Sequence, residues 1–228
     1  MIEYIGKTLL IDKKILVIGD LHLGYGSSLR KSGVMVPTSG YNESIDDLNK
    51  IFSRIGRVEK IVILGDIKHE IGAILNDERK EVSDLLEFIS KFSKETIIIK
   101  GNHDIMINFI VRDIRVVDFF IYKDFVFLHG NRNFSELFDK RIKFWVMGHI
   151  HPAITLKDGP KEERYKCFLV GNYGGKKIIF VPSFFPLIEG TDVREKKQAL
   201  PWPFNFGSFN VLVASGLEVL DFGRLSRI

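Results

Sequence analysis

The sequence predicts an α/β fold whose second half is mostly β-structure. Five short runs rich in Ile, Val and Phe are bounded by Gly or polar residues, which is typical of buried strands. Two segments between the early runs place apolar residues at helical spacing instead. Strand–helix–strand alternation predicts a sheet with parallel strands. The 228 residues suit one domain, which we take to be residues 1–228.

The predicted elements follow one another along the chain. The five strands are expected at residues 14–19, 60–65, 96–100, 124–130 and 143–148. One helix is expected at 42–56, where Gly56 is a natural stop, and its apolar face is formed by Ile45, Leu48, Phe52 and Ile55. A second is expected at 76–92, with an apolar face formed by Val82, Leu85, Leu86, Ile89 and Phe92.

The C-terminal third carries strand patterns without helical ones. Residues 166–181 read as a hairpin around their glycines. Residues 209–223 read as a second hairpin that turns near Ser215 and Gly216. Between them, residues 183–207 show no regular pattern and predict a long irregular segment.

Composition narrows the class of protein. Apolar residues make up 45% of the chain, which is enough for a sizeable core. A net charge of +4 is too small for a tight non-specific nucleic-acid binder but is compatible with an anionic substrate. The single Cys167 excludes an intrachain disulfide and a Cys-rich metal site. We see no signal peptide and no apolar run long enough for a membrane span, so a cytoplasmic protein is expected.

Two glycine-rich stretches resemble nucleotide-binding loops only superficially. GYGSSL at 24–29 lacks the third glycine of a dinucleotide fingerprint, and no helical pattern follows at once. GNYGGKK at 171–177 has the wrong spacing for a phosphate-binding loop, and no Ser or Thr follows its lysines. A hairpin turn is the better interpretation of the second stretch.

Polar residues of a particular kind follow all five predicted strands. All six histidines of the chain lie there, together with two aspartates and an Asn-His-Asp run. In open sheets, ligands bind outside the carboxyl ends of the strands. The candidate residues are Asp20, His22, Asp66, His69, Asn102, His103, Asp104, His129, His149 and His151.

These side chains suit a metal centre better than a set of structural histidines. Oxygen and imidazole ligands together favour Mn, Fe or Zn over Ca or Mg. Seven candidate ligands are too many for one tetrahedral zinc but suit two ions that share a carboxylate. Two carboxylates leave positive charge on two divalent ions, and a phosphate group would balance it. Two ions about 4 Å apart can clamp such a group and activate a water.

The order of the motifs resembles the calcineurin-like metallophosphoesterases. The chain reads Asp-x-His at 20–22, Gly-Asp at 65–66, Gly-Asn-His-Asp at 101–104, His-Gly at 129–130 and Gly-His-x-His at 148–151. The resemblance covers residues 15–152. It implies a four-layer α/β/β/α sandwich of two mixed β-sheets flanked by helices, with two metal ions at one edge.

The resemblance also implies a role for each residue. One ion would be held by Asp20, His22 and His151, the other by Asn102, His129 and His149, and Asp66 would bridge them. His103 would face the substrate without binding metal, either protonating the leaving oxygen or stabilising the transition state. Asp104 would orient His103. The ligands suit Mn best, and Fe, Zn or Ni would fit the same set.

His69 indicates a branch of the family. Asp-x-x-His in GDIKHE resembles the motif of the Mre11/SbcD nucleases, in which the histidine helps to position a phosphodiester. Phosphoprotein phosphatases carry Asp-Arg and GNHE at the corresponding places, and this chain departs from them at both. Together with DLHLGY and VPSFFPLIEGTD, the chain looks most like the small Mre11-related, ICC-like phosphoesterases. These lack the capping and ATPase-contacting segments of full nucleases, which argues against processive end resection. A supporting histidine without a catalytic part is the alternative for His69.

Three functions follow from these patterns. The leading hypothesis is a two-metal phosphodiesterase or nuclease that hydrolyses nucleic acid or a nucleotide with metal-activated water. The second is a phosphomonoesterase or cyclic-nucleotide phosphodiesterase of the same fold. The third is a non-catalytic protein-interaction scaffold, against which His103 and the complete ligand set argue. The sequence leaves the physiological substrate, the native metal and the oligomeric state open, and a homodimer is compatible with it.

Overall fold

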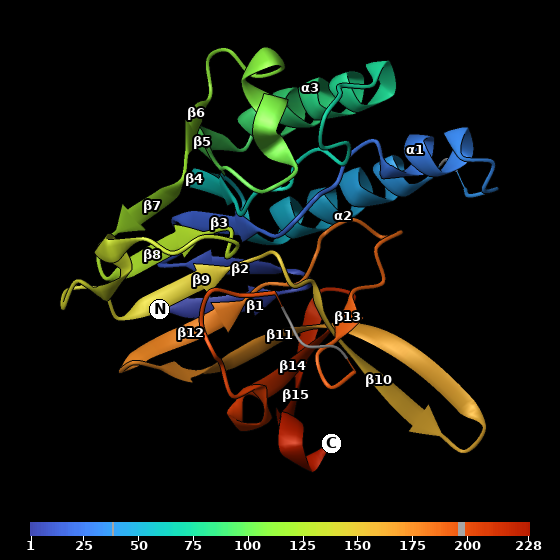
Figure 1. The fold of residues 1–228 in the computed structure, drawn as a ribbon. Coiled ribbons are helices and arrows are strands. Elements are labelled where there is room, and N and C mark those ends of the chain that lie inside the picture. The colour runs from blue at the N-terminus through green and yellow to red at the C-terminus, as the bar shows by residue number, and fades with distance from the viewer. Residues whose placement is uncertain (38, 196–198) are drawn as a thin grey trace.

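The computed structural model describes residues 1–37, 39–195 and 199–228, and two stacked β-sheets form its centre (Figure 1). The first sheet has six strands in the order β1-β2-β3-β4-β5-β6. Strands β1 to β3 are antiparallel and β3 to β6 are parallel. Their bounds are Ile2–Ile5, Thr8–Ile11, Ile15–Ile18, Val58–Ile63, Ser93–Ile99 and Arg115–Val117.

The second sheet has nine strands and is also mixed. Its order is β13-β10-β11-β12-β9-β8-β7, and β14 pairs with both β11 and β15. Strands β8, β9 and β12 run parallel at its centre. The bounds of β7 to β11 are Phe119–Tyr122, Phe125–Leu128, Phe144–Met147, Pro152–Asp158 and Lys161–Tyr173. Those of β12 to β15 are Lys176–Phe180, Thr191–Asp192, Asn210–Ser215 and Glu218–Arg224.

The space between the sheets holds one apolar cluster. The first sheet contributes Val17 and Val62, and the second contributes Phe127 and Phe168, all of them fully buried. Strands buried on both faces read as continuous apolar runs, which is why all five predicted strands were recognisable. All five are confirmed as β3, β4, β5, β8 and β9.

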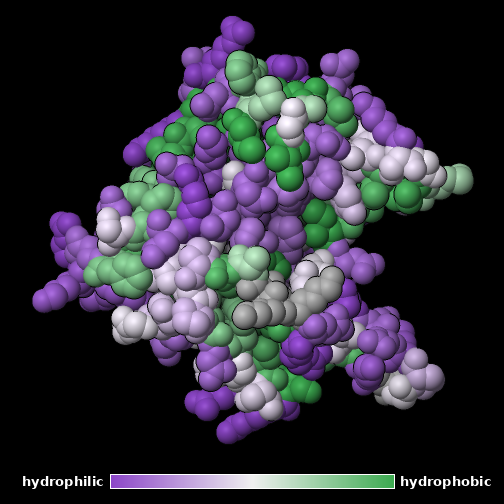
Figure 2. All heavy atoms as spheres, in the orientation of Figure 1, coloured by the Kyte–Doolittle hydropathy of each residue, from purple (hydrophilic) through white to green (hydrophobic). Residues whose placement is uncertain are grey.

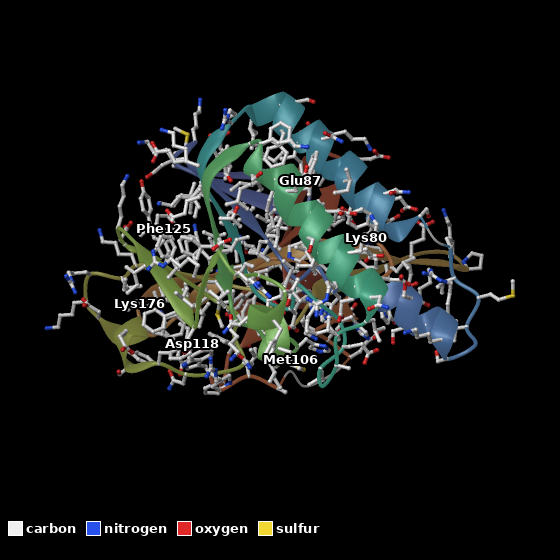
Figure 3. All side chains as sticks on the ribbon, turned by 90° about the horizontal axis from the view of Figure 1, so that it is seen from above. Lys80, Glu87, Met106, Asp118, Phe125 and Lys176 are labelled. Carbon is white, nitrogen blue, oxygen red and sulfur yellow. The ribbon has the colours of Figure 1, made fainter. Side chains whose placement is uncertain are left out.

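Two α-helices cover the outer face of the first sheet, and they lie across it side by side when the molecule is seen from above (Figure 3). Both predicted helices are confirmed, as α2 (Gly40–Ile55) and α3 (Asn76–Ser90). The backbone at Gly56, after α2, has a φ of 70°. Lys80 and Glu87 of α3 are exposed on the side away from the sheet.

The outer face of the second sheet is covered by aromatic residues and short 3-10 helices. Trp202 and Phe209 pack over the buried Trp145 there. The 3-10 helices are η2 (Ser135–Phe138), η3 (Phe206–Ser208) and η4 (Leu225–Arg227). The mixed sheets with flanking helices confirm the predicted fold class. Both predicted C-terminal hairpins are also confirmed, as β11–β12 and β14–β15.

One interpretation of the sequence is wrong. A helix lies within and just beyond the GYGSSL stretch, because α1 spans Tyr25–Lys31 and so begins at the second residue of the stretch. Its seven residues carry no amphipathic repeat, and tertiary contacts hold it instead. Ser27 Oγ donates to Asp77 Oδ2 at 2.9 Å, and Ser28 Oγ donates to Glu70 Oε1 at 2.6 Å.

Several further strands were not predicted, namely β1, β2, β6, β7 and β10. Strands β1 and β2 begin the chain, and β10 forms a long antiparallel pair with β11 that extends from the body of the molecule (Figure 1). The irregular segment at 183–207 is confirmed for its described residues, apart from the two-residue strand β13 and the start of η3.

The surface is predominantly hydrophilic on the face drawn in Figure 2, with smaller hydrophobic areas. Among the described residues, the helices are all too short or too polar to span a lipid bilayer.

Candidate metal centre

The candidate residues meet at one edge of the sandwich, where parallel strands of both sheets end. Asp20, Asp66 and Asn102 follow β3, β4 and β5 of the first sheet. His129 and His149 follow β8 and β9 of the second. Hydrogen bonds join the two sheets at this edge: Nδ1 of His129 donates to the carbonyl oxygen of Leu64 at 2.8 Å, and the amide of His149 donates to Asp20 at 3.1 Å.

A first group of possible metal ligands consists of two carboxylates and two imidazoles. Asp20, His22, Asp66 and His151 can offer ligand atoms that all lie within 4.8 Å of one another. Nε2 of His22 lies 3.1 Å from Nε2 of His151 and 3.7 Å from Oδ2 of Asp66. Nε2 of His151 lies 3.4 Å from Oδ1 of Asp20.

A second group shares Asp66 with the first. Asp66, His129 and His149 can offer ligand atoms within 4.8 Å of one another. Nε2 of His129 lies 3.4 Å from Oδ2 of Asp66 and 3.1 Å from Nδ1 of His149. Oδ1 of Asn102 lies 3.0 Å from the same Nε2. The structure thus brings all seven predicted ligand residues together in two groups, with His149 and His151 in different ones.

The hydrogen bonds of His129 and His149 show that a cation fits between them. A neutral imidazole has one N–H and one lone pair. Nδ1 of His129 donates to the carbonyl of Leu64, and Nε2 of His149 donates to the carbonyl of Ala199 at 3.3 Å. When both rings are neutral, the remaining nitrogens face each other, each with a lone pair, and a bound cation relieves that contact. Such an arrangement, with the far ring nitrogen fixed by a carbonyl, is typical of metal-ligating histidines.

The electrostatics of the edge also favour bound positive charge. Burial would lower the pKa of His129, but Asp66 and Asp20 outweigh it and raise the pKa to about 9. Burial would raise the pKa of Asp20, but His151, His129 and His22 hold that pKa well below its usual range. The centre therefore stabilises a cation among its imidazoles, and a divalent ion can take that place.

Other imidazoles are held neutral. Burial, and then the neighbouring His151, lower the pKa of His22 to about 3. Burial, and then His129, lower the pKa of His149. Both side chains can therefore present a lone pair near neutral pH, which metal ligation requires.

The backbone is strained at four of the ligand residues. The φ angles are 41° at His22, 46° at Asp66, 72° at His149 and 45° at His151. Non-glycine residues adopt this left-handed region at a cost, and such residues cluster at functional sites. No pattern in the sequence predicts this strain.

Two glycines allow the carboxylates to approach the backbone closely. A Cβ on Gly148 would lie 2.5 Å from Oδ2 of Asp20, and one on Gly101 would overlap Oδ1 of Asp66. We expect Gly148→Ala to displace Asp20 and to lower metal affinity by an order of magnitude or more, as outer-shell changes at metal sites do by about 10–100-fold.

Equilibrium dialysis against Mn²⁺ would measure this effect. Gly72→Ala is the matched control, because its Cβ would meet nothing within 4 Å. Wild-type affinity in Gly148→Ala would show that Asp20 does not depend on this close approach.

His103 lies beside the two carboxylate-containing ligand groups and belongs to neither of them. Its Nε2 is 3.9 Å from Oδ2 of Asp66, and its Nδ1 bonds to the backbone carbonyl of His69. A further grouping consists of the ring nitrogens of His22, His69 and His103, which lie within 4.8 Å of one another.

Asp104 is fully buried and bonds to backbone amides. Its Oδ1 accepts from the amides of Ile67 and Lys68 at 3.1 and 3.4 Å, and its Oδ2 accepts from Gly101 at 3.0 Å. Burial, and then Asp66, raise the pKa of Asp104 to about 6. The contact to the His103 ring comes from His69, so the predicted orientation of His103 by Asp104 stays a prediction.

His69 lies next to the predicted catalytic histidine. Its ring centroid is 5.6 Å from those of His103 and His22, and 4.5 Å from that of Tyr25. The sequence predicted that His69 lies beside the metal centre, but it did not predict that Tyr25 lies there too. A tyrosine that follows a strand-end motif by several residues has no pattern to distinguish it.

The chain belongs to the calcineurin-like phosphoesterase family, whose model matches residues 13–214. The family implies phosphate-ester substrates and a centre of two divalent metal ions, for which the structure supplies a His/Asp cluster.

Three solved structures are similar to this chain, and the first of them shares its fold. A nuclease from Pseudomonas putida, MPE, is 18% identical, with a TM-score of 0.63 over 95% of this chain and 91% of that chain. Yfce, a phosphoesterase from E. coli, is 13% identical, with a TM-score of 0.46 over 92% and 98%. Vps29 from Entamoeba histolytica, complexed with zinc, is 16% identical, with a TM-score of 0.42 over 92% and 99%. No curated protein matches the chain.

Proposed function

We propose that this protein is a two-metal phosphodiesterase that acts on nucleic acid or a nucleotide, with Mn²⁺ as its preferred metal. The observation that carries the proposal is the pair of ligand groups that share Asp66, with His103 and His69 directly beside them. The nuclease from Pseudomonas putida shows that this scaffold supports such chemistry in another protein.

The ligand groups account for phosphate binding and for the nucleophile. Two divalent ions held by Asp20, His22, Asp66 and the second group would neutralise the phosphate oxygens and lower the pKa of the attacking water. The chain itself supplies the strained, preorganised backbone that keeps the ligands in place. Mixed oxygen and nitrogen ligands support Mn²⁺ in this role.

His103 is placed to protonate the leaving oxygen. Its Nδ1 is directed at the carbonyl of His69, which fixes the proton on that nitrogen in both charge states. Nε2 therefore carries a proton only in the charged ring, and this proton is the one available for transfer. Nε2 faces the centre, 3.9 Å from Asp66.

His69 favours a diester over a monoester. A diester carries a second ester group, which must lie beside the metal centre and needs a hydrogen-bond donor. His69 is the next imidazole outward from His103, and it is half-buried. A monoester has more negative charge and binds mainly through the metals, so it depends less on this ring.

We expect His69→Ala to lower diester kcat/KM by an order of magnitude or more, about 1.4 kcal/mol of transition-state stabilisation. Monoester hydrolysis should fall much less, and the metal content should not change. The measurement compares bis-p-nitrophenyl phosphate with p-nitrophenyl phosphate in wild type and variant, with Mn²⁺ present.

Two outcomes would remove the diesterase assignment. Equal losses on both substrates, or no loss on either, would leave His69 without a role in recognising the second ester group. Wild-type hydrolysis of neither ester, with both ions bound, would favour a protein-interaction scaffold.

A further inference from the structure

Residues 66–75, which we call the His69 loop, connect the shared ligand Asp66 to helix α3. Glu78, in the first turn of α3, is fully buried behind this loop. Its Oε1 accepts hydrogen bonds from the amides of His69 and Glu70, both at 2.8 Å, and the His69 amide also donates to the carbonyl of Leu23 at 3.0 Å. Its Oε2 accepts from the amide of Leu75 at 3.3 Å. The Glu78 carboxylate therefore binds the His69 loop both at His69 and at Leu75, the last residue of the loop.

The charge of Glu78 is matched inside the protein. Lys68, also fully buried, places Nζ 3.9 Å from Oε2 of Glu78 and donates to the carbonyl of Ala73 at 3.1 Å. Buried charges persist where they are paired and hydrogen-bonded. On the other side, Gly24 packs so closely that a Cβ there would lie 2.6 Å from Cβ of Glu78. The aliphatic part of the Glu78 side chain thus has little room to move.

The His69 ring depends on its backbone for its position. Within the part of the chain that the structure describes, its buried Nδ1 has no hydrogen-bond partner. Its neighbours are rings, with Tyr25 on one side and His103 on the other. Among the described residues, no polar side chain bonds to Nδ1. The hydrogen bonds that Glu78 accepts from the backbone amides therefore help to set the position of this ring.

We propose that Glu78, neutralised by Lys68, is a positioning residue that holds the His69 imidazole where the second ester group of a diester binds. This inference rests on the proposed diesterase function and adds a residue to it. Glu78 does not touch the substrate, and it acts through the amides of His69 and Glu70. Neither Glu78 nor Lys68 stood out in the sequence, because Glu78 falls outside the strand-end motifs and Lys68 occupies a variable position of Asp-x-x-His.

A purely structural role for Glu78 makes a different prediction. Its bond to Leu75 also closes the first turn of α3, so its loss could disturb the whole centre. General damage lowers hydrolysis of both esters together. Loss of His69 positioning lowers the ratio of diester to monoester kcat/KM, because the monoester depends less on this ring.

The test therefore measures that ratio in Glu78→Met with Mn²⁺ present. Methionine keeps the length of the side chain but has no carboxylate oxygen, so the amides of His69, Glu70 and Leu75 all lose their acceptor on this side chain. We expect the ratio to fall about tenfold, close to the effect of His69→Ala, with two bound ions retained. Glu81→Met is the matched control, since Glu81 lies one turn further along α3 and accepts from Gly24 instead. An unchanged ratio in Glu78→Met would overturn the proposal.

A double-mutant cycle shows whether Glu78 acts through His69. In the His69→Ala background, Glu78→Met should leave the ratio unchanged. A further fall of similar size would mean that Glu78 acts elsewhere. If Glu78→Met does not fold because Lys68 is left unpaired, the variant Lys68→Met/Glu78→Met removes both charges. Its ratio should also stay about tenfold below wild type, and a wild-type ratio would overturn the proposal.

Amide hydrogen exchange separates this inference from the proposed function. Exchange at Glu70 should accelerate in Glu78→Met and remain unchanged in Glu81→Met, whether or not the protein hydrolyses either ester. Equal protection in all three proteins would overturn the inference alone. Absence of hydrolysis in wild type, with faster exchange in Glu78→Met, would overturn the proposed function and leave the positioning of the loop intact.

Discussion

Replacing His103 with alanine is expected to lower phosphate-ester hydrolysis by about 10²–10⁴-fold, the usual contribution of a general acid or base. The variant loses the ring nitrogen that faces the centre, 3.9 Å from Asp66. The metal content should stay at the wild-type level, because His103 lies outside both carboxylate-containing ligand groups. Steady-state kinetics with Mn²⁺ and metal analysis of the same samples would measure both quantities.

A second measurement distinguishes acid catalysis from support of the loop. The His103 ring also bonds to the carbonyl of His69, so its loss could disturb that loop. His103→Asn is the control, since it keeps a short donor for this carbonyl but has no transferable proton, and it should be nearly as inactive as alanine. Activity within about threefold of wild type, well below the catalytic range, would show that His103 has another role.

Replacing Asp66 with asparagine is expected to remove most of the bound metal. Its Oδ2 lies 3.7 Å from His22 and 3.4 Å from His129, so it serves both ligand groups. Asparagine keeps the shape but has only one weakly basic oxygen and no charge, so the imidazoles lose their shared counter-charge. Hydrolysis should be lost with the metal, and both should be measured after dialysis against limiting Mn²⁺.

The control for this variant is Asp84→Asn on the outer side of α3, where Asp84 pairs with Lys80. It changes the same net charge at a distance from the centre and should retain the wild-type metal content. Two ions bound at wild-type affinity in Asp66→Asn would exclude Asp66 as the shared ligand.

The sequence predicted the parts of the fold that have strong local patterns. Strands buried on both faces, such as β3 and β9, are continuous apolar runs, and α2 has a clear apolar face that ends before Gly56. Helix α1 has neither kind of pattern and is held by contacts such as Ser27 to Asp77, which lies far along the chain. The β10–β11 pair also lacks a strong local pattern, because the residues at its outer end are charged and exposed.

The candidate site was predictable in its composition but not in its geometry. The parallel strands bring their ends to one edge, so a list of polar residues after each strand was enough to gather the ligands. The strained φ at His149 depends on the tertiary structure and leaves no mark in the sequence. Buried Glu78 reads as an ordinary helix residue until its three amide partners are seen.

We propose that two metal ions at this centre hydrolyse a phosphodiester. The most direct test adds Mn²⁺ stepwise to metal-depleted protein and measures bound metal and bis-p-nitrophenyl phosphate hydrolysis in the same samples. We predict two bound ions per chain, with hydrolysis reaching its maximum only as the second ion binds. Full activity with one bound ion, or no diester hydrolysis with both ions bound, would exclude hydrolysis of a phosphodiester by two metal ions at this centre.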